Sequence, residues 1–408
     1  MDKRSNTRRI YMFFVMLMLF FIFLIFYLNK QFISNSDIDE HFRFALDLRL
    51  LPTMGIQQFS QEISFAHILS YPGWHLLFLA IYFLIEKLHM LFGYSVDVQN
   101  VAMWAQAIEN ALLLAITFAI IVECFAKYYG LSGKAALILG TIDMFIGPIY
   151  IPGISKDYYL GQFTANPWHN PTTLIVKPVA LMCFFIFCYL YNNRDNIPEK
   201  KQNKLCVCLA FGLMLSAWLK PSFYQAFVPA LFIFCVIDVL STKFASFKFC
   251  VKIGFGVLPV CLLALLQYII SFKANRNGII WSPWTVWNFY STNKGMSLLV
   301  SVAFPLIVII FNRFKVIKNA DILLSLYFFM SSVLQFICLG FTVGGLTGDF
   351  LWAVYLSVLM LFIPSENTML QMKQHKIKFS VCSIVLILHF LCGLGYFIGS
   401  YIQGTFRI

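Results

Sequence analysis

Continuous apolar runs, each close to the length that crosses a bilayer, recur from one end of the chain to the other. They lie near residues 10–28, 73–92, 101–126, 134–152, 173–192, 204–219, 222–240, 250–272, 297–311, 321–340, 350–364 and 378–401. The hydrocarbon core of a membrane takes roughly 20 apolar residues of helix. Only helices and closed barrels satisfy the backbone in lipid, and barrel strands alternate in polarity, whereas these runs do not. The pattern predicts an all-α, polytopic bundle of transmembrane helices.

The basic residues indicate an orientation. They cluster in short loops near 194–204, 243–252, 313–318 and 373–378. Cytoplasmic loops carry an excess of Lys and Arg, so these loops and the amino end are expected in the cytoplasm. The segments then expected outside are a first outer loop, 30–72, a second outer loop, 152–172, and the segments 273–294 and 340–350.

The sequence leaves two possible numbers of membrane crossings. Three apolar runs lie between the first and second outer loops, and an odd number of crossings cannot join two loops on the same side. Either one run, such as 73–92, is re-entrant or interfacial, or another run is split. The sequence therefore predicts 11 or 13 crossings, with the carboxyl end outside.

Composition excludes several classes of protein. The chain is 60% hydrophobic and 12% charged, so we expect residues 1–408 to form a single integral membrane domain. The net charge of +12 follows the positive-inside rule in its placement, which argues against a nucleic-acid partner. All eleven cysteines lie in or beside apolar runs, which predicts apolar packing, without a disulfide framework or metal site.

The first outer loop contains an unusual group of ionisable residues: Asp37, Asp39, Glu40 and His41. As a helix, this segment is amphipathic, and we expect it to lie flat in the membrane interface. Its polar face carries Asp39, Arg43 and Asp47, and its apolar face carries Ile38, Phe42, Ala45 and Leu46. One interpretation is structural: Asp37 caps the helix, Glu40 completes a capping box, and Asp39 pairs with Arg43. The other is an acid beside His41 at the mouth of a cavity.

The sequence Asp39-Glu40-His41-Phe42 resembles the Asp-Glu motif in the first external loop of the GT-C superfamily of polytopic membrane glycosyltransferases, particularly protein O-mannosyltransferases and aminoarabinose-lipid A transferases. The layout is also similar: one span, an interfacial helix with the acid, then many spans. The resemblance covers about the first 60 residues and this layout. It implies that Asp39 is the catalytic base or binds the acceptor, with Glu40 second. Asp37 is a rival, because a spaced pair of acids also occurs in the superfamily.

These residue types suit transfer of a sugar from a polyprenyl-phosphate donor. The enzyme has to deprotonate an acceptor hydroxyl and stabilise the departing phosphate, which needs one carboxylate and one or two cations. With Asp39 as base, the anomeric centre would invert. We expect a glycan, lipid or protein acceptor, in surface polysaccharide or glycolipid assembly. The alternatives are a polymerase of polysaccharide repeat units and a transporter or flippase of lipid-linked oligosaccharide.

The candidate substrate-binding residues combine cations, amides and aromatic groups. They are His41, Arg43, His75, Gln162, Asn166, Trp168, His169, Asn170, Lys177, Lys220 and Arg276. Those in the second outer loop suit a sugar, although the Asn-Pro steps there are also ordinary turns. Lys177 and Lys220 could clamp a lipid phosphate or snorkel to the headgroups.

Arg276 stands in the outer segment that also carries Trp281, Trp284 and Trp287. This group could cover the phosphate site, or form an interfacial aromatic belt. No ligand spacing demands a metal, although an acid near the membrane surface can hold a divalent cation.

Glu109 and Asn110 lie inside the apolar run 101–126. An ionisable group in a membrane span is costly and marks a functional site, and such acids are typical of transporters. Against a transporter, the chain has no internal repeat and no visible broken helix. We expect an integral protein of a bacterial cell (inner) membrane, with its amino end cytoplasmic and its active site on the outer face.

Overall fold

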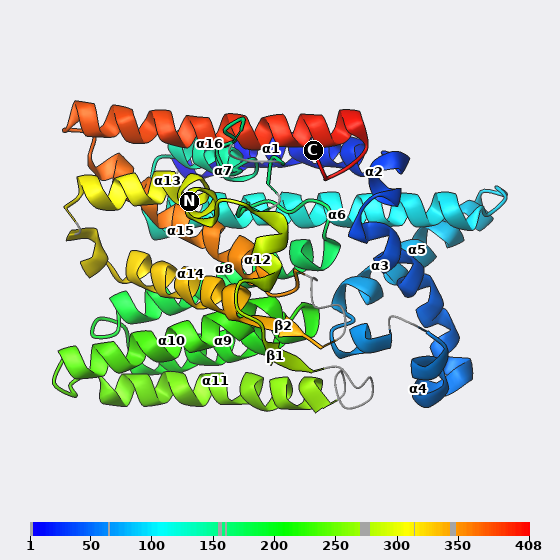
Figure 1. Cartoon of the computed structure of the whole chain (residues 1–408), viewed down its shortest axis with the longest axis horizontal. Coiled ribbons are helices and arrows are strands. Elements are labelled where there is room, and N and C mark those ends of the chain that lie inside the picture. Colours follow the sequence, from blue (N-terminus) through cyan, green and yellow to red (C-terminus); the bar gives the residue numbers. More distant parts are fainter. Residues whose placement is uncertain are drawn as a thin grey trace.

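The structure, a computed structural model, describes residues 3–63, 66–153, 157–159, 161–269, 278–313, 315–342 and 348–408. Helices form most of it (Figure 1). The α-helices are α1 (Lys3–Tyr27), α2 (Lys30–Ser34), α3 (Asp37–Asp47), α4 (Leu51–Glu62), α5 (Gly73–Leu91), α6 (Val98–Glu123), α7 (Gly133–Asp143), α8 (Pro171–Asn192), α9 (Glu199–Leu219), α10 (Ser222–Ser241), α11 (Phe247–Tyr268), α12 (Thr285–Tyr290), α13 (Lys294–Phe311), α14 (Ala320–Cys338), α15 (Leu351–Gln371) and α16 (Lys376–Gln403).

Short elements complete the chain. They are the helical turns η1 (Leu48–Leu50), η2 (Ala66–Ser70), η3 (Cys124–Tyr128) and η5 (Lys315–Lys318), and the strands β1 (Ile279–Trp281) and β2 (Leu339–Phe341). The two strands pair antiparallel, with Ile280 opposite Gly340. This ribbon joins the segment before α12 to the segment after α14.

The prediction of an all-α polytopic bundle is confirmed. Among the described residues, 11 helices are long and apolar enough to cross a membrane. They differ sharply in their surroundings: 94% of the apolar window of α15 is buried inside the bundle, against 11% for α11. Helix α15 is therefore the central helix, and α11 lies at the periphery.

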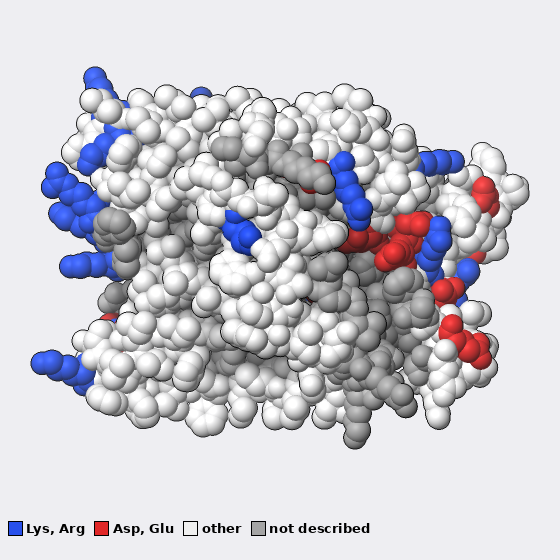
Figure 2. All heavy atoms as spheres, in the orientation of Figure 1, with Lys and Arg blue, Asp and Glu red and all other residues white. Residues whose placement is uncertain are grey.

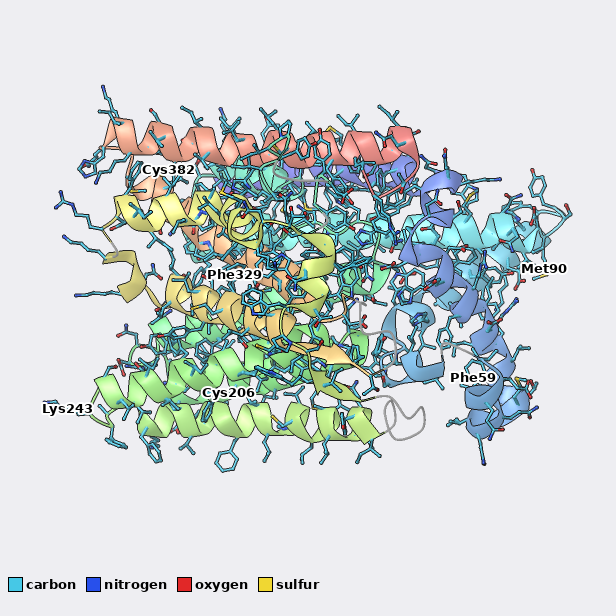
Figure 3. The ribbon with its side chains drawn as sticks, in the orientation of Figure 1. Phe59, Met90, Cys206, Lys243, Phe329 and Cys382 are labelled. Atoms are coloured by element: carbon cyan, nitrogen blue, oxygen red, sulfur yellow. The ribbon has the colours of Figure 1, made fainter. Side chains whose placement is uncertain are left out.

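The two ends of the bundle differ in charge. Lys and Arg side chains gather at one end, and the Asp and Glu side chains visible on this face lie mainly toward the other (Figure 2). Lys243, between α10 and α11, marks the lysine-rich end, whereas Phe59 of α4 and Met90 of α5 mark the opposite end (Figure 3). We call the latter the α3 end, because α3 and α4 lie there (Figure 1).

Helix α5 explains why the sequence gives an odd number of apolar runs between two loops on the same side of the membrane. Its first residue, Gly73, lies against Leu219 at the end of α9, and its body packs on the α3 region, where Arg49 lies 5.5 Å from the ring centroid of Tyr82. Helix α5 and the first turns of α6 extend past the ends of the other long helices (Figure 1). Although α5 meets the length criterion for a span, it does not run through the bundle.

The prediction of a continuous helix over 134–152 is wrong. Helix α7 ends at Asp143, and the residues described between it and Asn170 contain no regular helix. Gly133 lies beside Arg8 at the lysine-rich end, and Asn170 lies beside Asp37 at the α3 end, so this segment traverses the bundle. With it included and α5 left out, the described chain makes 11 passages, the lower of the two predicted numbers.

Backbone groups of the irregular segment find partners inside the bundle, as they must at membrane depth. The Gly147 N–H donates to the carbonyl of His389, and the His389 Nδ1 lies 2.7 Å from the carbonyl oxygen of Gly147. The Phe304 N–H lies 3.4 Å from the other ring nitrogen of His389. Gly393 permits this approach, because a Cβ there would run into the backbone of Phe145 and Gly147.

The amphipathic helix after the first span is confirmed as α3, but its capping differs from the structural interpretation. Ser36 is the N-cap, without a side-chain capping bond, and Asp37 is the first helical residue. The Ser36 hydroxyl donates backward to Ile33, and the Asp37 carboxylate turns to Asn170. The predicted Asp39 and Arg43 pair is present, with an N–O distance of 2.8 Å.

Candidate functional site

Three segments that are distant in sequence meet at the α3 end and bring an acid and a cation together. Asp37 is supplied by the start of α3, Asn170 by the residue before α8, and Lys220 by the connection between α9 and α10. Asn170 Nδ2 donates to Asp37 Oδ2 at 2.7 Å. Lys220 Nζ donates to Asn170 Oδ1 at 2.7 Å and to the hydroxyl of Thr172 at 2.8 Å. We call these four residues the Asp37 cluster.

Asn170 is fixed by its position as the N-cap of α8. Its Oδ1 accepts from the Thr173 N–H at 3.0 Å, and Pro171 at the first helical position has no N–H to satisfy. Because the side-chain oxygen faces these donors and Lys220, the amide nitrogen must face Asp37. A capping residue thus becomes a rigid bridge between the carboxylate and the ammonium.

Lys220 is buried at 6% exposure, and its Nζ lies 4.5 Å from the ring centroid of Trp352. Burial lowers the pKa of Lys220 to about 7, against the charges of Asp37 and Asp349, which favour the ammonium. An ammonium ion that is partly stripped of water and faces a partly exposed acid can bind an anionic group strongly.

Burial also raises the pKa of Asp37 above its usual range. The Asn170 hydrogen bond and the charges of Lys220 and Arg407 oppose this effect. A carboxylate with a raised pKa is a stronger base than an exposed one, as a general base for a hydroxyl group requires. Its side chain remains partly accessible.

An aromatic wall stands beside the cluster. The ring of His169 stacks on Phe406 with a centroid distance of 4.1 Å and lies 5.6 Å from the ring of Trp352. Burial, together with the charges of Lys220 and Arg407, lowers the pKa of His169 to about 3. His169 is therefore a neutral imidazole, and the hydroxyl of Tyr159 lies 3.1 Å from its Nε2.

The last residues of the chain return to this end. Asn35 donates to the carbonyl of Gly404 at 3.0 Å, and the Tyr158 N–H donates to the carbonyl of Ile408 at 2.6 Å. These contacts place Phe406 and Arg407 at the site.

The other acids of α3 point elsewhere. Asp39 lies about 200° around the helix from Asp37 and pairs with Arg43, whose side chain is 70% exposed. Glu40 is exposed, and its pKa is raised by its partial burial and by the charges of Asp37 and Asp39. His41 and His75 contact each other, with Nδ1 and Nε2 3.0 Å apart. The structure does not bring these residues to Lys220.

Most polar residues of the second outer loop support the loop itself. Asn166 donates to the carbonyls of Asp143 and Ile146. Its Oδ1 accepts from Lys177, which also donates to the carbonyl of Ala165. Lys177 is thus held inside the bundle and does not reach its surface.

Trp168 and Gln162 are buried as well. Trp168 stacks on Tyr396 with a centroid distance of 5.4 Å, and Gln162 donates to the carbonyl of Asp157. Arg276 lies outside the described residues. Trp287, from the same outer segment, donates to the carbonyl of Gly161, so it braces the loop that leads to His169 and Asn170.

Sequence reasoning missed four residues at this end: Asp349, Trp352, Phe406 and Arg407. Asp349 does fall in the expected outer segment 340–350 and is an acid beside an apolar run, which is a usable signal. Nothing in the sequence indicates that the carboxyl end folds back onto α3.

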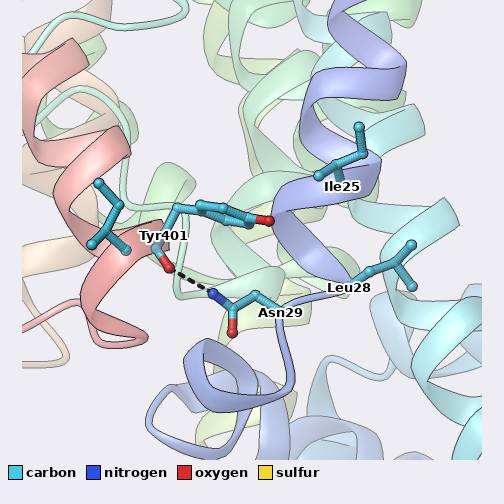
Figure 4. Close-up of a pocket in the computed structure, with 5 residues that line it drawn as sticks. Ile25, Leu28, Asn29 and Tyr401 are labelled. Carbon is cyan, nitrogen blue, oxygen red and sulfur yellow. Dashed lines mark hydrogen bonds between the residues drawn. The ribbon is translucent and has the colours of Figure 1, made fainter.

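One cavity is a separate feature. It measures about 470 Å³ and lies between the end of α1 and the end of α16, lined by Ile25, Leu28, Asn29, Tyr401 and Ile402. Asn29 bridges its walls by donating to the carbonyl of Tyr401 at 2.7 Å (Figure 4). A second cavity, of about 350 Å³, adjoins Tyr129 and Lys373 at the lysine-rich end.

In the described part of the chain, no three His, Cys, Asp or Glu side chains gather closely enough to suggest a metal site. No protein-family model, curated protein or solved structure matches the chain.

Proposed function

We propose that this protein is a membrane glycosyltransferase that transfers a sugar from a polyprenyl-phosphate-linked donor to an acceptor hydroxyl, with inversion, on the outer face of a bacterial cell membrane. The observation that supports this most is the Asp37 cluster: a partly buried acid and a buried ammonium are held by one asparagine at a single end of the bundle. By the positive-inside rule, the lysine-rich end is cytoplasmic, so the cluster faces outward.

In the proposed reaction, Asp37 accepts the proton of the acceptor hydroxyl while that oxygen attacks the anomeric carbon. The bond between this carbon and the phosphate oxygen breaks, and the electron pair leaves with the lipid phosphate. The Lys220 ammonium stabilises the phosphate charge as it develops, with Arg407 as a second cation. Preorganised charges of this kind are effective because they need no rearrangement during the reaction.

The structure favours Asp37 over Asp39 as the base within this proposal. Asp39 is already engaged in an ion pair with Arg43, whose side chain is largely exposed, and this pair lies away from Lys220. Asp37 is the acid that is linked to a cation able to hold the leaving group. The partly exposed Trp352 offers an apolar face for a sugar ring, and the stacked rings of His169 and Phe406 support it from behind.

One observation favours the rival function, transport of a lipid-linked oligosaccharide. The passage that begins with α7 loses its helical form after Asp143, and buried carboxylates lie at the end of α7 and nearby in the bundle. Discontinuous helices and buried acids near the middle of the membrane are typical of secondary transporters.

The test uses the purified full chain in proteoliposomes with a panel of radiolabelled polyprenyl-phosphate sugars and acceptors. We expect transfer by the wild type and a loss of about 100-fold to 10,000-fold in the Asp37→Asn variant, the range for removal of a general base. Asp39→Asn is the matched control and should retain the wild-type rate within a few-fold. Movement of intact lipid-linked sugar across the vesicle without transfer would support the transporter instead.

A further inference from the structure

A second polar cluster lies inside the bundle, apart from the Asp37 cluster. Asp143 is the last residue of α7, and Glu366 belongs to the central helix α15. Both side chains are fully buried, and the two carboxyl groups lie close enough to act on each other. Within the described chain, none of their four carboxyl oxygen atoms has a hydrogen-bond donor as a partner.

Two ionised carboxylates cannot share such a place. The repulsion of like charges grows as the effective dielectric constant falls, and each buried charge also loses its hydration. A proton between the two oxygens removes both costs, because one carboxyl group then donates a hydrogen bond to the other. Paired acids in enzyme active sites share a proton for the same reason.

Lys177 supplies the opposite charge. It is 1% exposed and acts electrostatically on Asp143, but its own hydrogen bonds go to Ala165 and Asn166. One ammonium balances one negative charge, so a pair that holds a single proton makes the cluster neutral. Other buried acids and histidines on the helices packed against α7 and α15 include Glu109 of α6, His389 of α16, Asp321 of α14 and Asp238 of α10.

We propose that Asp143 and Glu366 form a binding site for one proton, shared between their carboxyl groups and balanced by the ammonium of Lys177. This site is independent of the sugar chemistry. It has a structural consequence for the α3 end, because Lys177 holds residues 165 and 166 of the loop that carries His169 and Asn170.

The experiment is infrared spectroscopy of the full chain in lipid nanodiscs, in the carbonyl region of protonated carboxyl groups, identified by exchange from H₂O to D₂O. We expect one component that is lost in both Asp143→Asn and Glu366→Gln, since the remaining acid is then ionised opposite Lys177. Glu109→Gln is the matched control, because it removes another buried acid and should leave this component unchanged.

Lys177→Met gives a second, independent readout. Without the ammonium, the pair should take up another proton, and the protonated-carboxyl intensity of the pair should about double. Persistence of the component in either single amide variant, or no change in Lys177→Met, would overturn the proposal. A third result would also overturn it: the wild type lacks the component, and NaCl stabilises the protein whereas choline chloride does not. That result would identify a sodium site.

Discussion

Replacing Lys220 with Met should change how the stability of the protein depends on pH. In the folded protein, burial lowers the pKa of Lys220 from 10.5 to about 7. Between these pH values the unfolded chain binds a proton that the folded chain does not, so the free energy of unfolding rises with pH. At 1.36 kcal/mol for each pH unit, the full change is about 5 kcal/mol. The rise in unfolding free energy is complete near pH 10.5. Below pH 7 the buried amine is protonated, and the folded protein is destabilised by the full free energy of burying that charge.

The assay is equilibrium unfolding in mixed micelles of a mild detergent and dodecyl sulfate, at pH 6.5 to 10. The difference in unfolding free energy between wild type and Lys220→Met should grow in favour of the wild type by about 4 kcal/mol between pH 7 and 10. The exposed Lys248 gives the control, because Lys248→Met should follow the wild type at every pH. If the unfolding free energies of wild type and Lys220→Met changed with pH in parallel, Lys220 would not be a buried amine that loses its proton near neutral pH.

Three further outcomes are expected. The transfer rate should rise with pH as Asp37 ionises and fall above about pH 7 as Lys220 loses its proton. In Lys220→Arg, the fall in rate should begin at a higher pH. If the fall stayed at the same pH in the variant's pH-rate profile, this role for Lys220 would be contradicted. Arg43→Ala should change the unfolding free energy by less than about 1 kcal/mol, since it breaks an exposed pair, and a larger loss in the same micelle assay would count against that description. His389→Leu should cost about 2–4 kcal/mol, because it leaves two buried backbone groups without partners, and a loss below about 1 kcal/mol would show that the irregular segment has other support.

Much of the fold follows from the sequence because membranes impose simple rules. Apolar runs define the helices, and basic loops define one end of the bundle. The amphipathic pattern around Ile38 and Phe42 predicts α3 and its buried face, and spacing of four residues predicts the Asp39 and Arg43 pair. These features depend on residues close together in sequence, whose geometry a helix fixes.

The broken passage after Asp143 could not be predicted in this way. Hydrophobicity does not distinguish a helix from irregular chain whose backbone is satisfied by neighbours, and here the partners are His389, Val300 and Asn166. Helix α5 misleads for a related reason: its length suits a span, yet it packs on the α3 region.

Only part of the candidate site could be predicted from the sequence. Asp37, Asn170 and Lys220 were all candidates, but their association depends on contacts between residues that are 50 to 133 positions apart. The sequence suggested that Asp37 caps its own helix, whereas in the structure the Asp37 side chain accepts a hydrogen bond from the distant Asn170. Arg407 could not be assigned at all, because only the folded chain returns it to α3.

The most direct test of the central claim is the single-turnover rate of sugar transfer in Asp37→Asn compared with Asp39→Asn, with donor binding measured in parallel. The account predicts that Asp37→Asn slows the chemical step by about 100-fold or more while donor affinity stays within a few-fold, and that Asp39→Asn changes neither. Equal rates for the two variants, or a loss confined to Asp39→Asn, would contradict it.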